Sequence, residues 1–339
     1  MEDAKRMKLN TESTLYPVLS EELIGDIPLT SVYVATILNP KNISNLNSIL
    51  PIPELVHLKR VKEKDILLFP TNGINEEELH VMLKEKRFEI SQLENNFKTV
   101  MVAGIPPKIR RQYDAVHKIW PCNFHSNKYL EKLSTNTLFS ELEMSRHEDF
   151  MRVAIDVAKY AKENYFTKSK IGVVVVDPKI NSIVAVGYSN TTEGPCRHAA
   201  MVAIDNVAKT QNGGTWGVDD IPREHTELNE NGFPQDVLNY SRESHGMIRF
   251  GATWFKGKSE LKEPPEGPYL CTDYYIYLTH EPCVMCAMGL VHSRAKRIFF
   301  GVKSSNGGLK TLCKIHTVKN LNHHYEVFGG LMECLCKNL

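Results

Sequence analysis

The sequence predicts an α/β protein built of two consecutive domains. Segments rich in Val, Ile and aromatic residues, typical of strands, alternate with segments whose apolar residues recur at helical spacing, and this alternation starts again near residue 145. The 339 residues, of which 42% are hydrophobic and 24% charged, are enough for two cores. We therefore expect a flexible arm over 1–28, a first domain over 29–135 and a second domain over 145–339.

The first domain is predicted from the order of its elements. β-branched and aromatic residues indicate a strand at 29–38, and apolar residues at helical spacing indicate a helix at 43–50. Residues 56–69 form two short strands around the turn KEKD, and 98–104 form a last strand. Between them Asn75, with a glutamate three residues later, has the spacing of a helix-capping box. The resulting order, β-α-β-β-α-β, is that of a ferredoxin-like α+β domain.

The end of the first domain mixes cations with aromatic residues in the segment KIRRQYDAVHKIW. Residues on one helical face of it are Ile109, Tyr113, Val116 and Trp120. Its cations are Lys108, Arg110, Arg111 and Lys118. Single-stranded or looped RNA requires cations for its phosphates and flat faces for its bases. We expect the aromatic residues to pack in the core and the cations to contact RNA, with a merely solvated surface as the alternative.

Charge is unevenly distributed, although the net charge of +1 argues against a uniformly basic nucleic-acid binder. Residues 98–132 hold seven Lys or Arg against two acidic residues, and residues 294–339 hold eight against two. Residues 211–268 are instead acidic and rich in Gly and Pro, as expected of an inserted loop. The two basic segments are candidate RNA-binding surfaces, and the second begins with the candidates Arg294, Lys296 and Arg297.

The N-terminus and the cysteine content bear on localisation. The first residues, MEDAKRMKLN, are charged and lack an apolar signal core, and the apolar runs fall short of the roughly 18 to 20 residues that cross a bilayer. Eight cysteines in so long a chain show no stapling pattern, which favours free thiols or metal ligands over disulfides. We expect a cytoplasmic and nuclear protein without a membrane partner.

The second domain begins with an amphipathic helix and continues with strands and helices. Its expected elements are, in order, a helix around 150–161, strands at 171–176 and 183–188 about the turn DPKINS, a helix from His198, a strand at 274–279 and a helix at Cys283. Pro282 suits the first turn of this last helix. His198 and Cys283 are thereby each expected at the start of a helix.

Three residues of the second domain have the chemistry and spacing of a metal site: His198, Cys283 and Cys286. The Cys-x-x-Cys spacing puts both sulfurs on one face of a helix N-terminus, whose partial positive charge favours thiolate. Two thiolates and an imidazole leave one tetrahedral position open, the composition of a catalytic zinc site. Two cysteines one turn apart also often pack in a core. Zn2+ is the expected cofactor, because the histidine and the P-C-x-x-C match the zinc-deaminase signature H-x-E…P-C-x-x-C.

The sequence departs from this signature at Ala200, which stands where the signature has glutamate. In zinc deaminases this carboxylate is not a ligand; it delivers protons to the ring and to the leaving ammonia. A methyl group can do neither. Glu193 and Glu281 are the nearest carboxylates in the sequence that could substitute.

Two segments of the second domain resemble a known family. The run IYLTHEPCVMCAMGLVHSRAKRIFFGV is similar to the core motif of tRNA adenosine deaminases, and the tail LNHHYEVFGGLMECLC resembles their C-terminal segment, which adds Asn322 and His323 to the RNA-binding candidates. The resemblance covers about 145–339 apart from the insertion. Upstream, PPKIRRQYDAVHKIWPCNFHSNK resembles one branch only, the non-catalytic subunits of the eukaryotic heterodimeric enzyme that makes inosine at the tRNA wobble position. That branch also lacks the glutamate.

The resemblance implies a three-layer α/β/α zinc deaminase domain preceded by the ferredoxin-like domain. It implies two partners, tRNA and an active deaminase paralogue that converts adenosine-34 while this chain binds zinc and tRNA. Active relatives carry the TxEPC pattern of Glu281 beside their own catalytic glutamate, so we expect a structural role for Glu281. Two alternatives stay open: a zinc-stabilised RNA-binding module without a deaminase partner, and an active nucleobase deaminase that uses another acid.

Two further features concern the pocket beside the metal. Ser189 and Asn190 follow a Gly-Tyr pair where active relatives carry a base-contacting asparagine, so we expect adenosine not to be held there. The tail ECLCKNL could lie over the metal and supply Cys334, Cys336 or the terminal carboxylate as a fourth ligand. The alternative for the tail is the end of a surface helix.

Overall fold

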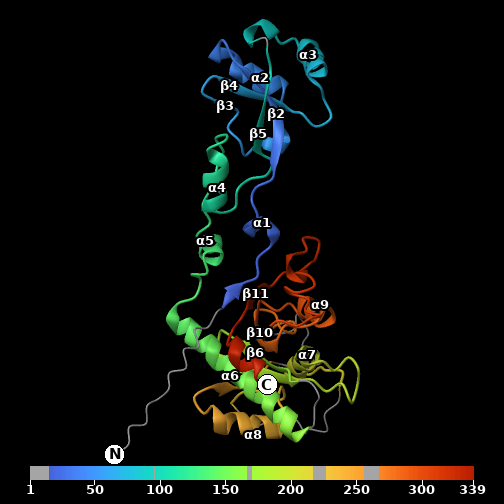
Figure 1. Cartoon of the computed structure of the whole chain (residues 1–339). Helices are drawn as coiled ribbons and strands as arrows, with labels where there is room; N and C mark the ends of the chain where they lie inside the picture. The colour runs from blue at the N-terminus through green and yellow to red at the C-terminus, as the bar shows by residue number, and fades with distance from the viewer. Residues whose placement is uncertain (1–14, 95, 166–169, 217–226, 256–266) are drawn as a thin grey trace, which may run out of the picture. The chain divides into compact units, whose positions relative to one another are not determined.

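The computed structural model describes residues 15–94, 96–165, 170–216, 227–255 and 267–339, which fall into two compact units (Figure 1). One unit comprises residues up to Leu19 together with Phe139–Leu339, and the other comprises Ser20–Leu138. The chain therefore leaves the first unit after its N-terminal segment, forms the second unit and returns. Residues 1–14 of the expected arm lie outside the described residues.

The unit Ser20–Leu138 contains, within its described residues, a four-stranded sheet of order β3-β4-β2-β5 in which all neighbours are antiparallel. Its strands are β2 (Leu29–Thr36), β3 (Val61–Lys62), β4 (Asp65–Pro70) and β5 (Lys98–Ala103). Helix α2 (Ile43–Ile49) connects β2 to β3, and α3 (Glu76–Glu85) connects β4 to β5. The predicted order β-α-β-β-α-β is confirmed.

The capping box predicted at Asn75 is present at the start of α3. The Asn75 side chain accepts a hydrogen bond from the backbone N–H of Glu78 at 2.8 Å, and the Glu78 carboxylate accepts one from the Asn75 N–H at 2.8 Å. These bonds satisfy backbone donors that the first turn of a helix leaves without partners. Leu79 and Leu83 of α3 are fully buried against the sheet.

Residues 20–134 also include α1 (Glu21–Ile24), α4 (Arg110–His117), which shares a buried cluster with the strands, and α5 (Lys128–Ser134). The predicted apolar face of α4 is confirmed as core, because Val116 and Trp120 are buried and the indole N–H of Trp120 donates to the Lys59 carbonyl at 2.6 Å. The expected loose arm is wrong for residues 15–28. Gln112, buried in α4, donates to the carbonyls of Glu22 and Gly25 and so fixes the α1 segment.

The larger unit is built on a mixed sheet that, in the described part of the chain, has seven strands in the order β1-β11-β10-β9-β6-β7-β8. The strands are β1 (Tyr16–Pro17), β6 (Gly172–Asp177), β7 (Ser182–Tyr188), β8 (Arg249–Phe250), β9 (Tyr275–His280), β10 (Arg297–Val302) and β11 (Glu326–Gly329). Strands β9, β10 and β11 are parallel. Their C-terminal ends therefore meet at one edge of the sheet.

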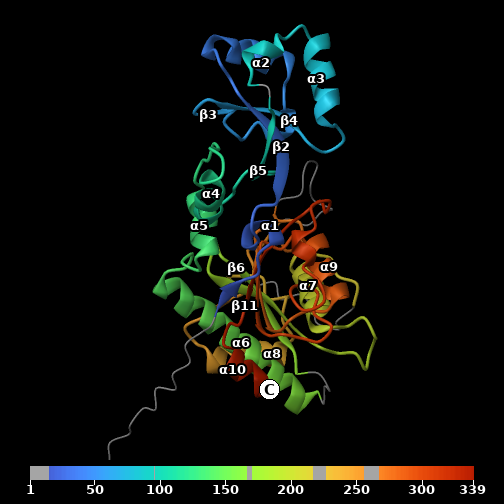
Figure 2. The same ribbon diagram turned by 45° about the horizontal axis from the view of Figure 1, so that its top comes forward.

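Helices cover both faces of this sheet (Figures 1 and 2). They are α6 (Glu141–Asn164), α7 (Ala199–Thr210), α8 (Gln235–Ser244), α9 (Val284–His292) and α10 (Glu333–Lys337). Adjacent residues of β10 show the two faces: the ring of Phe299 lies 4.4 Å from that of His147 in α6, whereas Phe300 packs in the cluster that includes Leu290 of α9. Since α7 packs on α9 and α8 on α6, the unit has the expected three layers.

The insertion expected as a loop at 211–268 contains regular structure. Helix α8 packs on α6 and contains the fully buried Val237 and Leu238, and β8 adds a parallel strand beside β7. The helix was not predicted, because the residues around this apolar pair are rich in Gly, Pro and acidic residues. Residues 217–226 and 256–266 of the insertion lie outside the described residues.

The segment before Ser20 belongs to the larger unit. Strand β1 pairs antiparallel with β11, the Val18 N–H donates to the Val327 carbonyl at 2.8 Å, and His316 Nε2 bonds the Val18 carbonyl at 2.8 Å. Burial lowers the pKa of His316 to about 4, so its ring is neutral at pH 7 and donates from Nε2. None of the described helices is long and apolar enough to span a membrane.

Candidate metal centre

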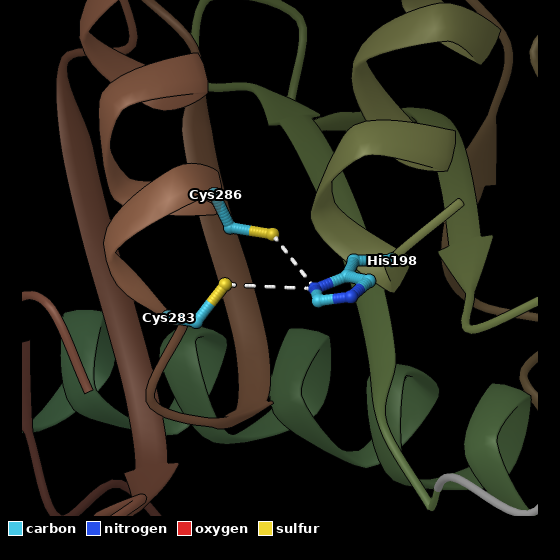
Figure 3. Close-up of side chains that lie close together, drawn as sticks. All are labelled: His198, Cys283 and Cys286. Atoms are coloured by element: carbon cyan, nitrogen blue, oxygen red, sulfur yellow. Dashed lines mark hydrogen bonds between the residues drawn. The ribbon is translucent and has the colours of Figure 1, made fainter. Parts of the chain in front are cut away.

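The predicted ligands lie at the N-termini of two neighbouring helices. His198 is the N-cap residue of α7, Cys283 is the N-cap residue of α9, and Cys286 lies in the first turn of α9. Each helix follows a strand, β7 and β9 respectively, as the sequence predicts. Because the N-termini of α7 and α9 face each other, three ligands from distant parts of the sequence converge (Figure 3).

The distances between these side chains suit a tetrahedral zinc ion. His198 Nδ1 lies 3.5 Å from Cys283 Sγ and 3.6 Å from Cys286 Sγ, and the three ligand atoms lie within 4.8 Å of one another. Zinc bonds of about 2.3 Å to sulfur and 2.0 to 2.1 Å to nitrogen at tetrahedral angles separate the two ligand atoms by about 3.6 Å. Burial raises the pKa of the Cys286 thiol well above its ordinary value, so a bound cation is needed to hold it as thiolate.

Ala200 occupies the first turn of α7, two residues after the histidine ligand. Its side chain is 3% exposed and packs in the core cluster with Ala203 and Cys286. The methyl group neither donates nor accepts a proton. The position next to the metal ligands therefore lacks the group that zinc deaminases use for proton transfer.

Glu281 cannot substitute for that group, because its carboxylate is saturated by hydrogen bonds. One oxygen accepts from the backbone N–H groups of Leu309, Lys310 and Thr311 at 3.0, 2.6 and 3.0 Å, and the other accepts from the Thr311 hydroxyl at 2.5 Å. The residue is 1% exposed. The structural role predicted for Glu281 is confirmed, whereas the loop that it holds was not foreseen.

The other carboxylate and the expected base-contacting position belong to the loop before α7. Glu193 forms an ion pair with Arg197, and 60% of its side chain is exposed. The guanidinium of Arg197 also lies over the ring of Trp216, 5.4 Å from its centroid. Asn190 accepts a hydrogen bond from the Thr192 hydroxyl at 3.1 Å, within the same loop. Each of these side chains thus already contacts another residue of the protein.

The C-terminal tail does not cap the metal site, contrary to the first expectation for it. A Cβ atom at Gly301 of β10 would lie 2.4 Å from Cys336 Sγ, and Gly301 points to the same face of the sheet as Phe299 and α6. The metal ligands lie with α7 and α9 on the other face. Within α10, Cys336 is buried and Cys334 is exposed. The tail instead forms the short helix α10, in agreement with the alternative that it is the end of a helix.

Comparison with known proteins agrees with this geometry. Residues 144–302 match the family model described as "Cytidine and deoxycytidylate deaminase zinc-binding region", and 268–338 match "MafB19-like deaminase". Proteins of Danio rerio and Homo sapiens named "Probable inactive tRNA-specific adenosine deaminase-like protein 3" are each 33% identical over 95% of this chain, and cover 93% and 90% of their own length. "tRNA-specific adenosine deaminase TAD3" of Arabidopsis thaliana is 27% identical over 90% of this chain and 92% of its own.

The chain belongs to the tRNA-specific adenosine deaminase-like protein 3 family. The match extends over both units, so it includes the ferredoxin-like part and not only the zinc-binding region. The names of these vertebrate members describe them as probably inactive, which agrees with the alanine at position 200 of this chain.

The cations that the sequence proposes for RNA contact in the smaller unit have different surroundings. Lys108 forms an ion pair with Glu22, and Arg111 donates to Asp26 at 3.2 Å and to the Ile24 carbonyl at 2.6 Å. These two cations hold the α1 segment. Two others are exposed on α4, where the guanidinium of Arg110 lies 5.4 Å from the ring centroid of Phe124 and Lys118 follows the last turn.

The candidates in the larger unit lie at the N-terminal ends of β9 and β10, whereas the metal ligands follow the C-terminal ends. Arg297 bonds Glu326 at 2.7 Å, Lys296 lies 3.8 Å from Asp273, and His323 bonds the Ala295 carbonyl at 2.7 Å. Two others are exposed: Arg294, with its guanidinium over the ring of Tyr269, and Asn322. β10 has six residues, so about 20 Å of strand separates this group from the metal edge.

Proposed function

We propose that this chain is the non-catalytic, zinc-binding subunit of a heterodimeric tRNA adenosine deaminase that converts wobble adenosine-34 to inosine. The observation that carries the proposal is a complete three-ligand set, His198, Cys283 and Cys286, beside Ala200 in place of the proton-carrying glutamate. Relatives of similar length share this family's name, and one in Schizosaccharomyces pombe is named "tRNA-specific adenosine deaminase subunit tad3".

Zinc would act in this chain as a structural ion. The described residues around it include no carboxylate placed to transfer protons to a substrate. His198 and the two cysteines lie at the N-termini of α7 and α9, which also pack on each other, so a shared ion would join the two helices. Two cysteines and a histidine that share one ion would fix the two helices relative to the sheet. The chain's own residues thus support the fold and leave hydrolysis to another subunit.

Exposed apolar side chains on α9 support a protein partner. Val284 and Met285 are 42% and 39% exposed in its first turn, and the partly buried Met288 of α9 and Met201 of α7 pack against the core cluster. A row of methionines and aliphatic side chains next to the metal centre is the kind of surface that another folded chain covers. We assign it to the catalytic paralogue, which supplies the missing glutamate.

Binding of tRNA would draw on the exposed cations of both units. Arg110 and Lys118 lie on the exposed side of α4, whose other side is core, as a phosphate-binding helix requires. Lys108 and Arg111 contribute indirectly by positioning the α1 segment. A subunit that acts on tRNA is expected in the cytoplasm and the nucleus.

The decisive experiment is to produce the chain with and without the catalytic paralogue and to assay inosine on full-length tRNA. We expect a stable complex that forms inosine, and no inosine from this chain alone. Inosine from the purified chain alone would instead identify an active deaminase with another acid. Tight tRNA binding without any association with the paralogue would identify a zinc-stabilised RNA-binding module.

A further inference from the structure

Three lysines follow the C-terminal end of β10, at the edge of the sheet where the metal centre lies. Cys283 follows the parallel strand β9, and Lys303 is the first residue after β10. The segment continues through Lys310 to Lys314. Its Gly308 N–H donates to the Pro282 carbonyl at 2.8 Å, and Gly307 forms an isolated β-bridge with Cys283. The lysine segment is therefore in direct contact with the turn that carries the metal ligand.

The backbone of this segment is held rigidly. Glu281 accepts the N–H groups of residues 309–311, as described above. A Cβ atom at Gly307 would lie 2.1 Å from the Glu281 carboxyl carbon, and one at Gly308 would lie 2.9 Å from the Cα of Val284. Such close approaches leave the loop little room to move. Lys310 is thus presented from a fixed backbone.

Positive charge is concentrated on this segment. Lys310 Nζ lies 3.6 Å from the ring centroid of Tyr16, Lys314 Nζ donates to the Leu19 carbonyl at 3.1 Å, and Lys303 is exposed. Burial and the positive charges of Lys303 and Lys314 lower the pKa of Lys310. The carboxylates of Glu281 and Glu333 oppose that shift, and Glu333 also pairs with Lys337 at 2.6 Å. The positive charges of one segment repel one another, and a bound anion relieves the repulsion.

We propose that Lys303, Lys310 and Lys314 form a binding site for the phosphodiester backbone of RNA beside the metal centre. The inference deepens the proposed function and rests on it, because it names the surface of the larger unit that holds tRNA. Ammonium groups bind phosphate as point charges without reading a base, so this site contributes affinity and position but no sequence preference. With Ala200 nearby, RNA at this edge is held and not deaminated by this chain.

The site differs from the candidates that the sequence proposes in the same unit. Arg294, Lys296 and His323 lie at the opposite edge, and Lys296 shares Asp273 with Lys179 there. A negatively charged partner for both lysines weakens the attraction of that edge for phosphate. We therefore assign the RNA contact to the segment after β10.

The test compares two pairs of substitutions in the complex of this chain with its catalytic paralogue. Lys303→Gln with Lys310→Gln removes two charges from the metal edge, and Lys159→Gln with Lys179→Gln removes two exposed lysines that form ion pairs elsewhere in the same unit. For each we would measure tRNA binding as a function of salt concentration. Each lost phosphate contact reduces the slope of log K against log salt by about 0.7 to 0.9. We expect a slope lower by about 1.5 and at least tenfold weaker binding at the metal edge, and an unchanged slope for the control pair.

Equal slopes for the metal-edge pair and the unsubstituted complex would overturn the site, as would equal losses for both pairs. Zinc content and thermal unfolding confirm that each variant folds. Should the pair not fold, Lys303→Gln alone changes an exposed residue and should lower the slope by about one contact. Lys310→Arg keeps the charge and should keep the slope. Inosine formation by the unsubstituted complex tests the proposed function separately, since it can succeed while the lysine site fails.

Discussion

At the scale of single residues, Ala200 and Glu281 differ in what their side chains do near the metal ligands. Position 200 lacks the carboxylate that the chemistry needs, and Glu281 has a carboxylate that the fold uses. A short local motif could predict the ligands and the missing acid, because His198, Ala200, Cys283 and Cys286 occupy fixed positions in it. The partners of Glu281 lie 23 to 30 residues further along the chain, so no local pattern reveals the loop it holds.

Replacing Glu281 tests its structural role. Glu281→Gln keeps one oxygen that can accept from the backbone N–H groups of residues 309–311, but it removes the negative charge and replaces the oxygen that accepts from Ser304 and Thr311 by an NH2 donor. We expect the free energy of unfolding to fall by about 2 to 4 kcal/mol in urea titrations. Glu193→Gln, at an exposed position, serves as the control and should change it by less than about 0.5 kcal/mol. A fully stable Glu281→Gln protein would show that the loop is held by other contacts.

At the scale of elements, the candidate metal ligands lie at two helix N-termini that the sequence correctly predicts. The capping box of α3 was predictable for the same reason, since its partners are three residues apart. The helix α8 was missed, because its buried face consists of few apolar residues in a segment rich in Gly, Pro and acidic residues. The pairing of α1 with α4 was missed because its partners are about 86 residues apart.

Zinc removal tests the link between α7 and α9. We expect about one zinc per chain by elemental analysis, and Cys286→Ala should lose both the zinc and most of the folded protein, because structural zinc contributes directly to folding. Cys334→Ala, an exposed cysteine of α10, is the matched control and should keep the zinc. Well-folded unsubstituted protein without zinc would refute the assignment.

The cations of the smaller unit separate into two functional pairs. Arg110→Gln with Lys118→Gln removes exposed charge from α4, so we expect a tRNA-binding slope lower by about 1.5 and unchanged stability. Lys108→Gln with Arg111→Gln breaks the ion pairs to Glu22 and Asp26, so we expect easier proteolysis near residue 25 and a smaller change in slope. A larger change in slope for the Lys108 and Arg111 pair would show instead that these two residues contact RNA directly.

At the scale of the whole molecule, the zinc-binding unit is discontinuous in sequence. Residues 15–19 complete its sheet before the chain forms the unit Ser20–Leu138 and returns at Phe139. The sequence could predict both units from their patterns, but it could not predict that two paired residues, Tyr16 and Pro17, form an edge strand. So short a strand has no periodicity of its own.

Truncation tests this connection. A chain that begins at residue 20 loses the partners of Val327, Lys314 and His316 and the buried side chains of Leu15 and Val18. We expect its melting temperature to fall by about 10 °C relative to a chain that begins at residue 15. Equal melting temperatures would show that β1 contributes nothing to the unit.

The proposed role of this chain is to support deamination without performing it. The most direct test is single-turnover inosine formation on full-length tRNA by a complex whose catalytic paralogue has lost its glutamate and whose present chain carries Ala200→Glu. We predict no inosine, because Asn190, Glu193 and Arg197 are engaged with neighbours, and acid–base catalysis requires a substrate within hydrogen-bond reach. Inosine above the level of the same complex with Ala200 unchanged would refute this role, since it would show that this pocket still binds adenosine.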